Sequence, residues 1–236
     1  MIVAIDGPAG AGKSSVAKRL ADRLGFAFLD TGSMYRSITL ACLEQGIDLQ
    51  DQSIVAQIAG SITLHLDHER VWMNDRDITS EIRLPRITQS VRFIADNVQV
   101  RGLMIELQRQ IALGRDIVTE GRDQGTVAFP KAECKIFLTA SPEERARRRV
   151  LQIVENGGSA NYDDILRQQE TRDEEDRNRK VGGLRRADDA IEVITDGLSE
   201  AEVLDRLVEI VTERRASLRP HPFQNPSLHP DRDSLP

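Results

Sequence analysis

The chain has 236 residues, 39% of them hydrophobic and 30% charged, with a formal net charge of -6. This length suits one sizeable domain with insertions. The acidic balance argues against a protein that coats DNA or RNA, which would need a basic excess. The two cysteines and four scattered histidines suggest neither a disulfide framework nor a metal cluster. No apolar segment approaches membrane-spanning length. We therefore expect a cytoplasmic protein whose partners are neither membranes nor nucleic-acid polymers.

The first predicted element is an apolar strand at residues 2–5 that leads into a glycine-rich loop. Residues 7–14 fit the P-loop pattern Gly-x-x-x-x-Gly-Lys-Ser, and an amphipathic helix follows. Glycines let backbone N–H groups face a phosphate, and the N-terminus of the helix attracts the anion. Lys13 adds a mobile charge, and Ser14 adds a hydroxyl group for Mg²⁺. We expect nucleotide phosphates to bind at Gly7, Pro8, Ala9, Gly10, Ala11, Gly12, Lys13, Ser14 and Ser15.

A second strand is predicted at residues 26–29, and a polar loop at residues 30–36 follows it. Ligands bind beyond the carboxyl ends of strands in an open parallel sheet, so this loop is a candidate binding loop. The helix that begins there should end at Gly46, and a shorter helix is expected at residues 54–58.

The apolar pattern then alternates over residues 62–73, which predicts strands in place of helices. Asn74-Asp75 is typical of a tight turn, so we expect a small antiparallel insert. His65 falls on the polar side of this insert, where a solvated side chain is expected. Two amphipathic helices should follow at residues 87–94 and 103–111.

Two further buried strands are predicted at residues 117–119 and 136–139. The first leads to another polar loop, residues 120–125, again at the end of a strand. Ser141, Pro142 and Glu144 predict the start of the next helix: Ser141 is the cap, Pro142 lies in the first turn and Glu144 completes a capping box.

The two polar helices that follow are joined by Gly157-Gly158 and carry eight arginines. Because carboxylates interleave with these arginines, a solvated helical pair with ion pairs four residues apart is one interpretation. In a P-loop protein, however, such a hairpin, poor in apolar residues, is typical of a lid that closes over phosphates. We favour the lid. The eight residues are Arg145, Arg147, Arg148, Arg149, Arg167, Arg172, Arg177 and Arg179.

A last strand is predicted at residues 191–195, and Ser199 with Glu202 caps a final helix that should end near Arg215. Beyond Leu218 the chain contains five prolines and almost no apolar residues, so we expect disorder there.

Three longer motifs closely resemble the bacterial cytidylate kinase family, and the resemblance covers nearly everything except the tail. They are Asp30-Thr31-Gly32-Ser33-Met34-Tyr35-Arg36, Glu120-Gly121-Arg122-Asp123-Gln124-Gly125-Thr126-Val127 and Arg172-Asp173-x-x-Asp176-x-x-Arg179. The resemblance implies a P-loop NTPase fold of class α/β, with three layers (α/β/α) around a five-stranded parallel sheet. It also implies a core at residues 1–30, 101–145 and 181–216, a nucleoside monophosphate (NMP)-binding domain with the antiparallel insert at 31–100, a helical lid at 146–180 and a disordered tail at 217–236.

The same resemblance implies that the γ-phosphoryl group of ATP is transferred to CMP or dCMP, with Mg²⁺ at Ser14, by a monomeric enzyme. Cytosine offers an amino donor beside ring acceptors, so its pocket needs a cation and a carboxylate. Uracil reverses part of this pattern and should be rejected. Arg101 and Asp123 match the family positions for that pair. The implied acceptor site comprises Thr31, Tyr35, Arg36, Arg101, Arg122, Asp123, Arg172, Asp176 and Arg179, and the implied catalytic cations are Lys13, Arg122, Arg179, Arg145 and Arg149.

Two positions depart from the family pattern. Many relatives have a base-contacting serine where this chain has Arg92, and many have Ala-Pro-Leu after the lid where this chain has Gly182-Gly183-Leu184. Two alternative functions also stay open. One is a P-loop kinase for another small acceptor, such as a different nucleoside monophosphate. The other is a nucleotide-dependent switch or binding module, although the chain has no Asn-Lys-x-Asp guanine motif.

Overall fold

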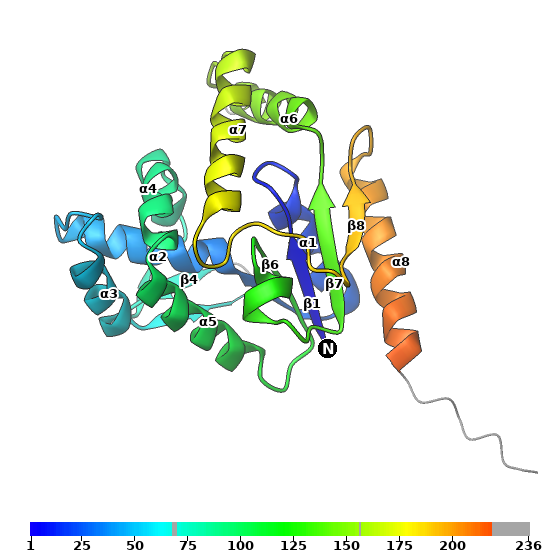
Figure 1. Cartoon of the computed structure of the whole chain (residues 1–236), viewed down its shortest axis with the longest axis horizontal. Coiled ribbons are helices and arrows are strands. Elements are labelled where there is room, and N and C mark those ends of the chain that lie inside the picture. The colour runs from blue at the N-terminus through cyan, green and yellow to red at the C-terminus, as the bar shows by residue number, and fades with distance from the viewer. Residues whose placement is uncertain (68–69, 156, 219–236) are drawn as a thin grey trace, which may run out of the picture.

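The computed structural model describes residues 1–67, 70–155 and 157–218, and its centre is a five-stranded parallel sheet (Figure 1). The strand order is β2-β6-β1-β7-β8. Residues on β1 alternate between the two faces, with Val3 and Ile5 buried on one and Ala4 on the other. The strands are β1 (Ile2–Asp6), β2 (Ala27–Asp30), β6 (Ile117–Gly121), β7 (Cys134–Thr139) and β8 (Ile191–Ile194). The predicted sheet is therefore confirmed.

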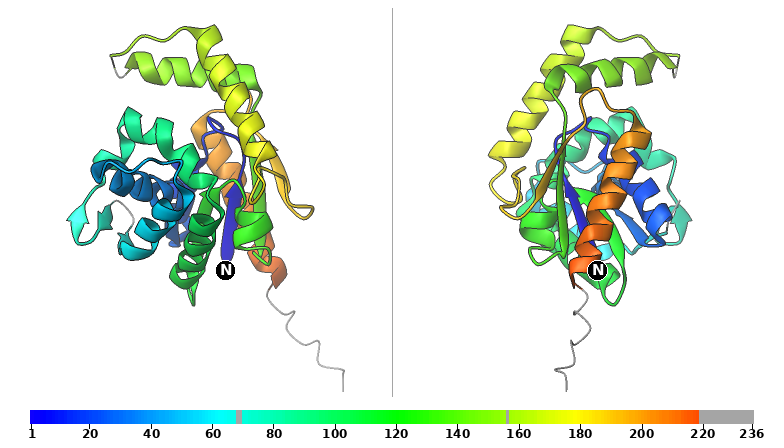
Figure 2. Two further views of the ribbon diagram at one scale, coloured as in Figure 1. Left: turned by 60° about the vertical axis from the view of Figure 1, so that its left-hand side comes forward. Right: turned by 90° about the vertical axis from the view of Figure 1, so that its right-hand side faces the viewer.

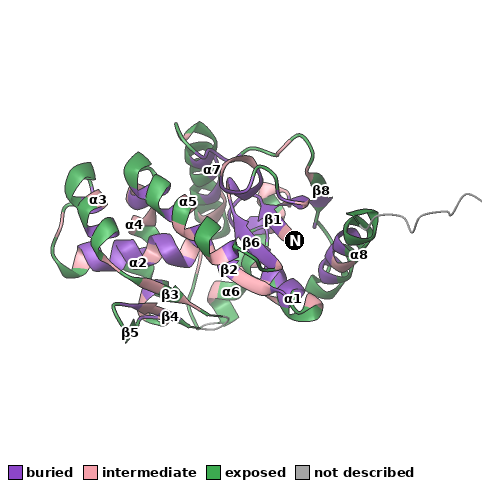
Figure 3. Cartoon of the chain, turned by 90° about the horizontal axis from the view of Figure 1, so that it is seen from below, coloured by how far each residue is buried: buried purple, intermediate pink, exposed green. Residues whose placement is uncertain are grey.

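Two helices, α1 (Lys13–Leu24) and α8 (Glu200–Leu218), pack against each other over one face of the sheet. Apolar residues four apart on α1, among them Val16 and Leu20, are buried there, and Figure 3 shows buried residues concentrated where these helices meet the sheet. The α8 helix opens with a reciprocal capping box. Ser199 N donates to Glu202 Oε2 at 2.8 Å, and Glu202 N donates to Ser199 Oγ at 3.3 Å. The helix continues past Arg215 to Leu218, so the first two residues of the predicted disordered tail (217–236) are helical; residues 219–236 lie outside the described residues.

A second hydrophobic cluster on the other face joins the sheet to the segment between β2 and β6. Here β3 and β4 pair antiparallel, as do β4 and β5, and the turn between the last two has Asn74 at φ 48° and Asp75 at φ 65°. These left-handed angles suit Asn and Asp in a tight hairpin, so the predicted insert is confirmed. The segment comprises α2 (Thr31–Glu44), α3 (Gln52–Ser61), β3 (Leu64–Leu66), β4 (Val71–Met73), β5 (Arg76–Asp77), η1 (Glu81–Arg83), α4 (Pro85–Ala95) and α5 (Val98–Ala112).

Helices α6 (Pro142–Glu155) and α7 (Tyr162–Asn178) form a hairpin that projects beyond the carboxyl ends of the strands (Figures 1 and 2). The predicted helix start at Pro142 is confirmed, and Glu144 N donates to Ser141 Oγ at 3.3 Å. The predicted reciprocal half of the capping box is wrong. Asp196 accepts from Ser141 N at 3.0 Å, whereas the Glu144 carboxylate pairs with Arg147 and Arg148. Within the described ranges, no helix has the length and apolar character needed to cross a bilayer.

Candidate active site

The glycine-rich loop lies between the carboxyl end of β1 and the start of α1, as the sequence predicts. Gly7 has φ 153°, and a Cβ atom built on it would lie 1.9 Å from the backbone oxygen of Leu138 on β7. Gly12 directly precedes α1 with φ 84°. Glycine tolerates both conformations. At position 7, any side chain would overlap the backbone of β7. The loop is thus pressed against the sheet, and the N-terminus of α1 faces the space above the strands.

Lys13 is almost fully buried, and its Nζ donates to the carbonyl oxygen of Pro8 in the same loop at 2.7 Å. Burial, and then the positive charge of Arg122, lowers the pKa of Lys13 to about 7, although Glu120 and Asp6 oppose the shift. Without a bound anion the ammonium group is therefore poorly compensated, and a phosphate there would stabilise its charged form.

Two carboxylates support this loop from neighbouring strands. Ser14 Oγ donates to Glu120 Oε1 at 2.9 Å. Asp6 accepts from the backbone N–H groups of Gln124 at 2.8 Å and Gly125 at 2.7 Å, and burial raises its pKa to about 6. Asp6 thereby ties the end of β1 to η2 (Gln124–Ala128), a short helical turn after β6.

A cluster of arginines from three separate segments lies beside Lys13. Arg36 Nη2 pairs with Asp30 Oδ2 at 3.1 Å, and Arg122 Nε pairs with Asp176 Oδ2 at 2.8 Å. Arg179 Nη2 reaches Asp176 Oδ1, also at 2.8 Å. Although burial opposes the shift, the charges of Arg122 and Arg179 lower the pKa of Asp176 below its usual value.

This cluster carries more positive than negative charge. Arg172 makes no hydrogen bond or ion pair with any part of the chain that the structure describes. Partial burial lowers the pKa of Arg172, and the nearby charges of Arg122 and Arg36 lower it further. Arg36 Nε is buried and lacks a partner among the described residues. A buried cation whose pKa is lowered by neighbouring cations would be stabilised by an anion bound beside it.

On the far side of this cluster, Arg101 and Asp123 form a buried ion pair, with 2.5 Å between Nη2 and Oδ2 and exposed fractions of only 4% and 5% for the side chains. Arg101 Nη1 also donates to the carbonyl oxygen of Ala95. Arg101 Nε has no hydrogen-bond partner among the described residues, and the Asp123 carboxylate has no ion-pair partner there besides Arg101. The Tyr35 ring lies beside the pair, with its centroid 5.8 Å from Arg101 Cζ, and burial raises the pKa of Tyr35 to about 12.

The other predicted site residues have different surroundings. Thr31 Oγ1 donates to the backbone oxygen of Glu120 at 2.7 Å, which joins the ends of β2 and β6. Arg145 is buried in an ion pair with Asp173 at 2.6 Å, and its Nη1 donates to the P-loop carbonyl oxygen of Ala9 at 2.8 Å. Arg149 lies one turn further along α6, where it is exposed and contacts Gln152 of the same helix. Arg145 therefore ties the hairpin to the P-loop, whereas Arg149 stands apart from the cluster.

Sequence reasoning missed the carboxylates that organise the site. Asp6 and Glu120 stand at the ends of β1 and β6, so their position was a usable signal. No sequence signal pointed to Asp96. It lies at the end of α4 and pairs with Arg179 Nε at 2.6 Å, although the two residues are 83 positions apart in the sequence. Within the described ranges, no group of three or more His, Cys, Asp or Glu side chains could hold a metal ion.

A parallel sheet with a P-loop at the end of its first strand, and cationic side chains converging beside that loop, defines a P-loop nucleotide-binding fold equipped for phosphoryl transfer. The family model for cytidylate kinase matches residues 3–213. A cytidylate kinase from Rhodopirellula baltica is 53% identical over 213 residues, which make up 90% of this chain and 93% of that protein. One from Mycobacterium leprae is 46% identical over 219 residues, 92% of this chain and 98% of that protein. This chain belongs to the cytidylate kinase family.

Proposed function

We propose that this protein transfers the γ-phosphoryl group of ATP to CMP or dCMP, giving ADP and CDP or dCDP. Membership of the cytidylate kinase family supports this activity. The structural observation that carries it is the excess of positive charge beside the P-loop, where burial, and then the charge of Arg122, lowers the pKa values of both Lys13 and Arg172. An enzyme that brings two phosphate-bearing substrates together needs such a cluster, because their charges would otherwise repel.

In the proposed reaction, a phosphate oxygen of CMP attacks the γ-phosphorus of ATP, and the bond from that phosphorus to the β,γ-bridging oxygen breaks. The attacking oxygen is already ionised, so no general base is needed and catalysis rests on positioning and charge neutralisation. Lys13 is placed to contact the transferred group, since it lies within the loop that would hold the ATP phosphates. Arg36, Arg122 and Arg179 would hold the phosphate of CMP, with Asp176 keeping two of them in place.

The buried Arg101–Asp123 pair supports a preference for cytosine. Arg101 Nε is a buried donor without a hydrogen bond, and the Asp123 carboxylate has Arg101 as its only ion-pair partner among the described residues. Cytosine offers the complementary groups, an amino donor next to ring acceptors. Uracil presents a carbonyl group in place of the amino group, so it would leave buried polar groups unpaired at a cost of about 1–3 kcal/mol. Tyr35, Thr31, Arg172 and Asp176 complete the proposed acceptor site.

We further propose that Ser14 holds Mg²⁺ together with the ATP phosphates, where the ion would neutralise charge that develops during transfer. The hydroxyl group of Ser14 and the carboxylate of Glu120 are 2.9 Å apart, and oxygen donors of this kind suit Mg²⁺. Residues 31–100 are proposed to move as the CMP-binding domain and residues 146–180 as a lid whose Arg145 and Arg149 approach ATP. We also propose that the protein is a monomer and that it works in the cytoplasm.

The experiment is a coupled ATP-consumption assay with purified protein and Mg²⁺, using CMP, dCMP, UMP, AMP and shikimate as acceptors. We expect turnover with CMP and dCMP, and kcat/KM for UMP lower by about tenfold to a hundredfold. Asp123→Asn should lose most of the preference for CMP over UMP while the KM for ATP stays unchanged. Turnover with another acceptor only, or with none, would exclude the proposed reaction.

A further inference from the structure

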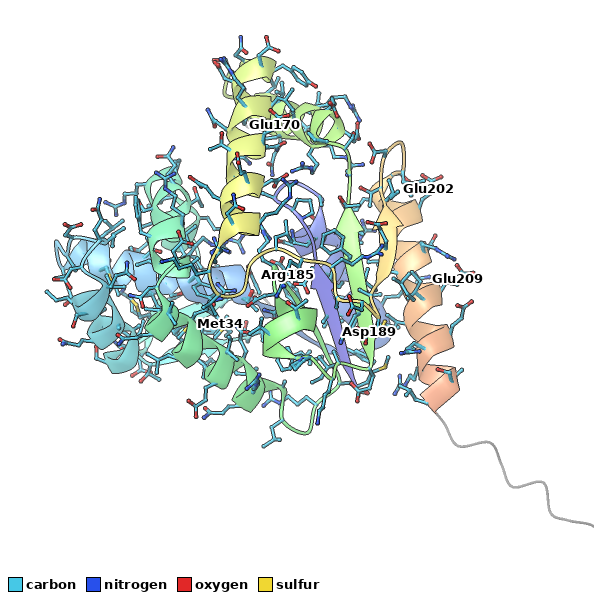
Figure 4. The ribbon with its side chains drawn as sticks, in the orientation of Figure 1. Met34, Glu170, Arg185, Asp189, Glu202 and Glu209 are labelled. Carbon is cyan, nitrogen blue, oxygen red and sulfur yellow. The ribbon has the colours of Figure 1, made fainter. Side chains whose placement is uncertain are left out.

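Between α7 and β8 the chain crosses in front of the sheet; Arg185 and Asp189 mark this connection in Figure 4. It is fixed near both ends. Leu184 N donates to the carbonyl oxygen of Asp176 at 2.8 Å, and Asp189 Oδ1 accepts from Lys135 Nζ at 2.9 Å. The connection therefore has a defined path past the residues proposed to bind CMP.

At Gly182 this connection lies directly against the Arg101–Asp123 pair. Gly182 has φ 66°, and a Cβ atom built on it would lie 2.1 Å from both Nε and Nη2 of Arg101 and 2.3 Å from Asp123 Oδ2. The carbonyl oxygen of Gly182 accepts from Arg101 Nη2 at 3.2 Å. No side chain fits this space, and the bare backbone is also a ligand of the guanidinium group.

Neither partner can easily move away from this contact. The Arg101 and Asp123 side chains are almost fully buried, and Arg101 Nη1 is held by the carbonyl oxygen of Ala95. The next residue, Gly183, is packed closely against the end of α7, because a Cβ built there would lie 2.9 Å from the backbone oxygen of Arg177. The orientation of the ion pair is thus set from one side by the backbone of Gly182.

We propose that Gly182 is a specificity-determining position: its backbone is the wall that holds Arg101 and Asp123 in the arrangement that distinguishes cytosine from uracil. The inference rests on the proposed function, because the ion pair is taken to read the base. Gly182 acts as a positioning residue. It offers the base no side chain, but in the left-handed conformation that this chain adopts, any side chain placed there would displace both groups that are proposed to contact the base.

The test compares Gly182→Ala with Gly46→Ala, a matched control. Gly46 has the same φ, 66°, but a Cβ atom there would meet nothing within 4 Å. Both variants carry the strain of an L residue in the left-handed region, and only Gly182→Ala adds the collision. Steady-state assays would give kcat and KM for CMP and UMP, and KM for ATP.

We expect Gly182→Ala to raise the KM for CMP about tenfold or more and to reduce the CMP-to-UMP ratio of kcat/KM by a similar factor. The KM for ATP and the kcat at saturating CMP should stay within about twofold of the wild type, and Gly46→Ala should leave every constant within that range. In an Arg101→Ala/Asp123→Ala background, adding Gly182→Ala should not change the ratio further, because both groups that the added methyl group would displace are absent.

Two outcomes would overturn the inference while leaving the kinase activity standing: equal constants for the two glycine variants, or a lower KM for CMP in Gly182→Ala, which would show that the backbone obstructs the base. A wild-type protein inactive toward CMP refutes the proposed function instead. If Gly182→Ala does not fold, thermal unfolding of a further variant shows whether the collision is the cause. Recovery of folding when Arg101→Ala and Asp123→Ala are both added to Gly182→Ala supports the collision, and no recovery contradicts it.

Discussion

Single side chains at this site depend on charges supplied by their neighbours. Lys13 has only the Pro8 carbonyl oxygen as a hydrogen-bond partner among the described residues, with Arg122 nearby. Its ammonium group is desolvated without full compensation, so its pKa falls to about 7. ATP would bring several negative charges to the same place. Binding and protonation of Lys13 are therefore linked.

At pH 8, ATP binding should take up about one proton per site, because Lys13 is largely neutral in the free protein and charged beside phosphate. The sign follows from the shift, because a bound anion raises the lowered pKa of Lys13. At a pH between the pKa of the free protein and that of the complex, Lys13 therefore takes up a proton when ATP binds. Titration calorimetry in two buffers of different ionisation enthalpy measures this uptake. Lys13→Arg, which stays charged at pH 8, should show none. Identical heats in both buffers for the wild type would refute the linkage.

The same shift makes a contribution to stability with a defined pH window. Lys13 has a folded pKa of about 7, whereas the ordinary value of 10.5 applies when the chain is unfolded. Between these values the unfolded chain binds more protons, so this group makes stability rise with pH there. Below pH 7 its contribution is at its least favourable. ATP would remove the penalty by restoring the charge.

Among the elements, the P-loop is held by backbone contact with β7 as well as by its own turn. Gly7→Ala should lower the free energy of unfolding by about 3 kcal/mol or more, because the added methyl group overlaps the backbone oxygen of Leu138. Gly12→Ala is the matched control in the same loop: its φ is 84°, and a Cβ there meets nothing within 4 Å. It should cost about 1–2 kcal/mol from strain alone. Urea unfolding measures the free energy of unfolding of both variants. Equal losses of stability would contradict the close contact between Gly7 and β7.

The start of α6 offers a second test at this scale. Asp196→Ala should cost about 1 kcal/mol, because the Asp196 carboxylate binds the backbone N–H and the hydroxyl group of the cap residue Ser141. Glu144→Ala should cost less, since Glu144 only pairs with Arg147 and Arg148 near the surface. Thermal unfolding of the two variants compares them. A larger loss for Glu144→Ala would favour the capping box predicted from the sequence.

These elements also show where sequence reasoning stops. Local patterns predicted the strands, the Asn74-Asp75 turn and the capping box at Ser199, because each depends on residues a few positions apart. Contacts between distant segments left no local signal. Asp196 reaches Ser141 across 55 positions, and Gly182 meets Arg101 across 81. The family motifs identified the candidate site residues, but the binding of CMP by these residues stays a prediction.

Across the whole molecule, helices α4 and α7 and the residues that directly follow them are linked by two ion pairs, one exposed and one made by a buried Arg179 side chain. Arg92 pairs with Glu175 at 3.1 Å, and Asp96 pairs with Arg179 at 2.6 Å. Arg92 is also the position where many relatives carry a serine. The exposed Arg92–Glu175 pair contributes about 0.2–1 kcal/mol. It would therefore oppose only weakly the separation of these two parts that we propose for substrate entry.

The α6–α7 hairpin projects beyond the sheet (Figure 2), and its outer arginine Arg149 contacts only Gln152 of its own helix among the described residues. If the hairpin closes over bound phosphates, small-angle scattering should show the radius of gyration falling by about 2–5% when CMP and a non-transferable ATP analogue bind together. Lys13→Met with the same ligands is the control, and should stay near the unliganded value because its loop lacks the charge that attracts ATP. Either ligand alone should give a smaller decrease, since each would neutralise only part of the cationic cluster. An unchanged radius in the wild type, with both sites shown by calorimetry to be filled, would mean that the hairpin is a fixed wall, and access to Lys13 would then depend on residues 31–100 alone.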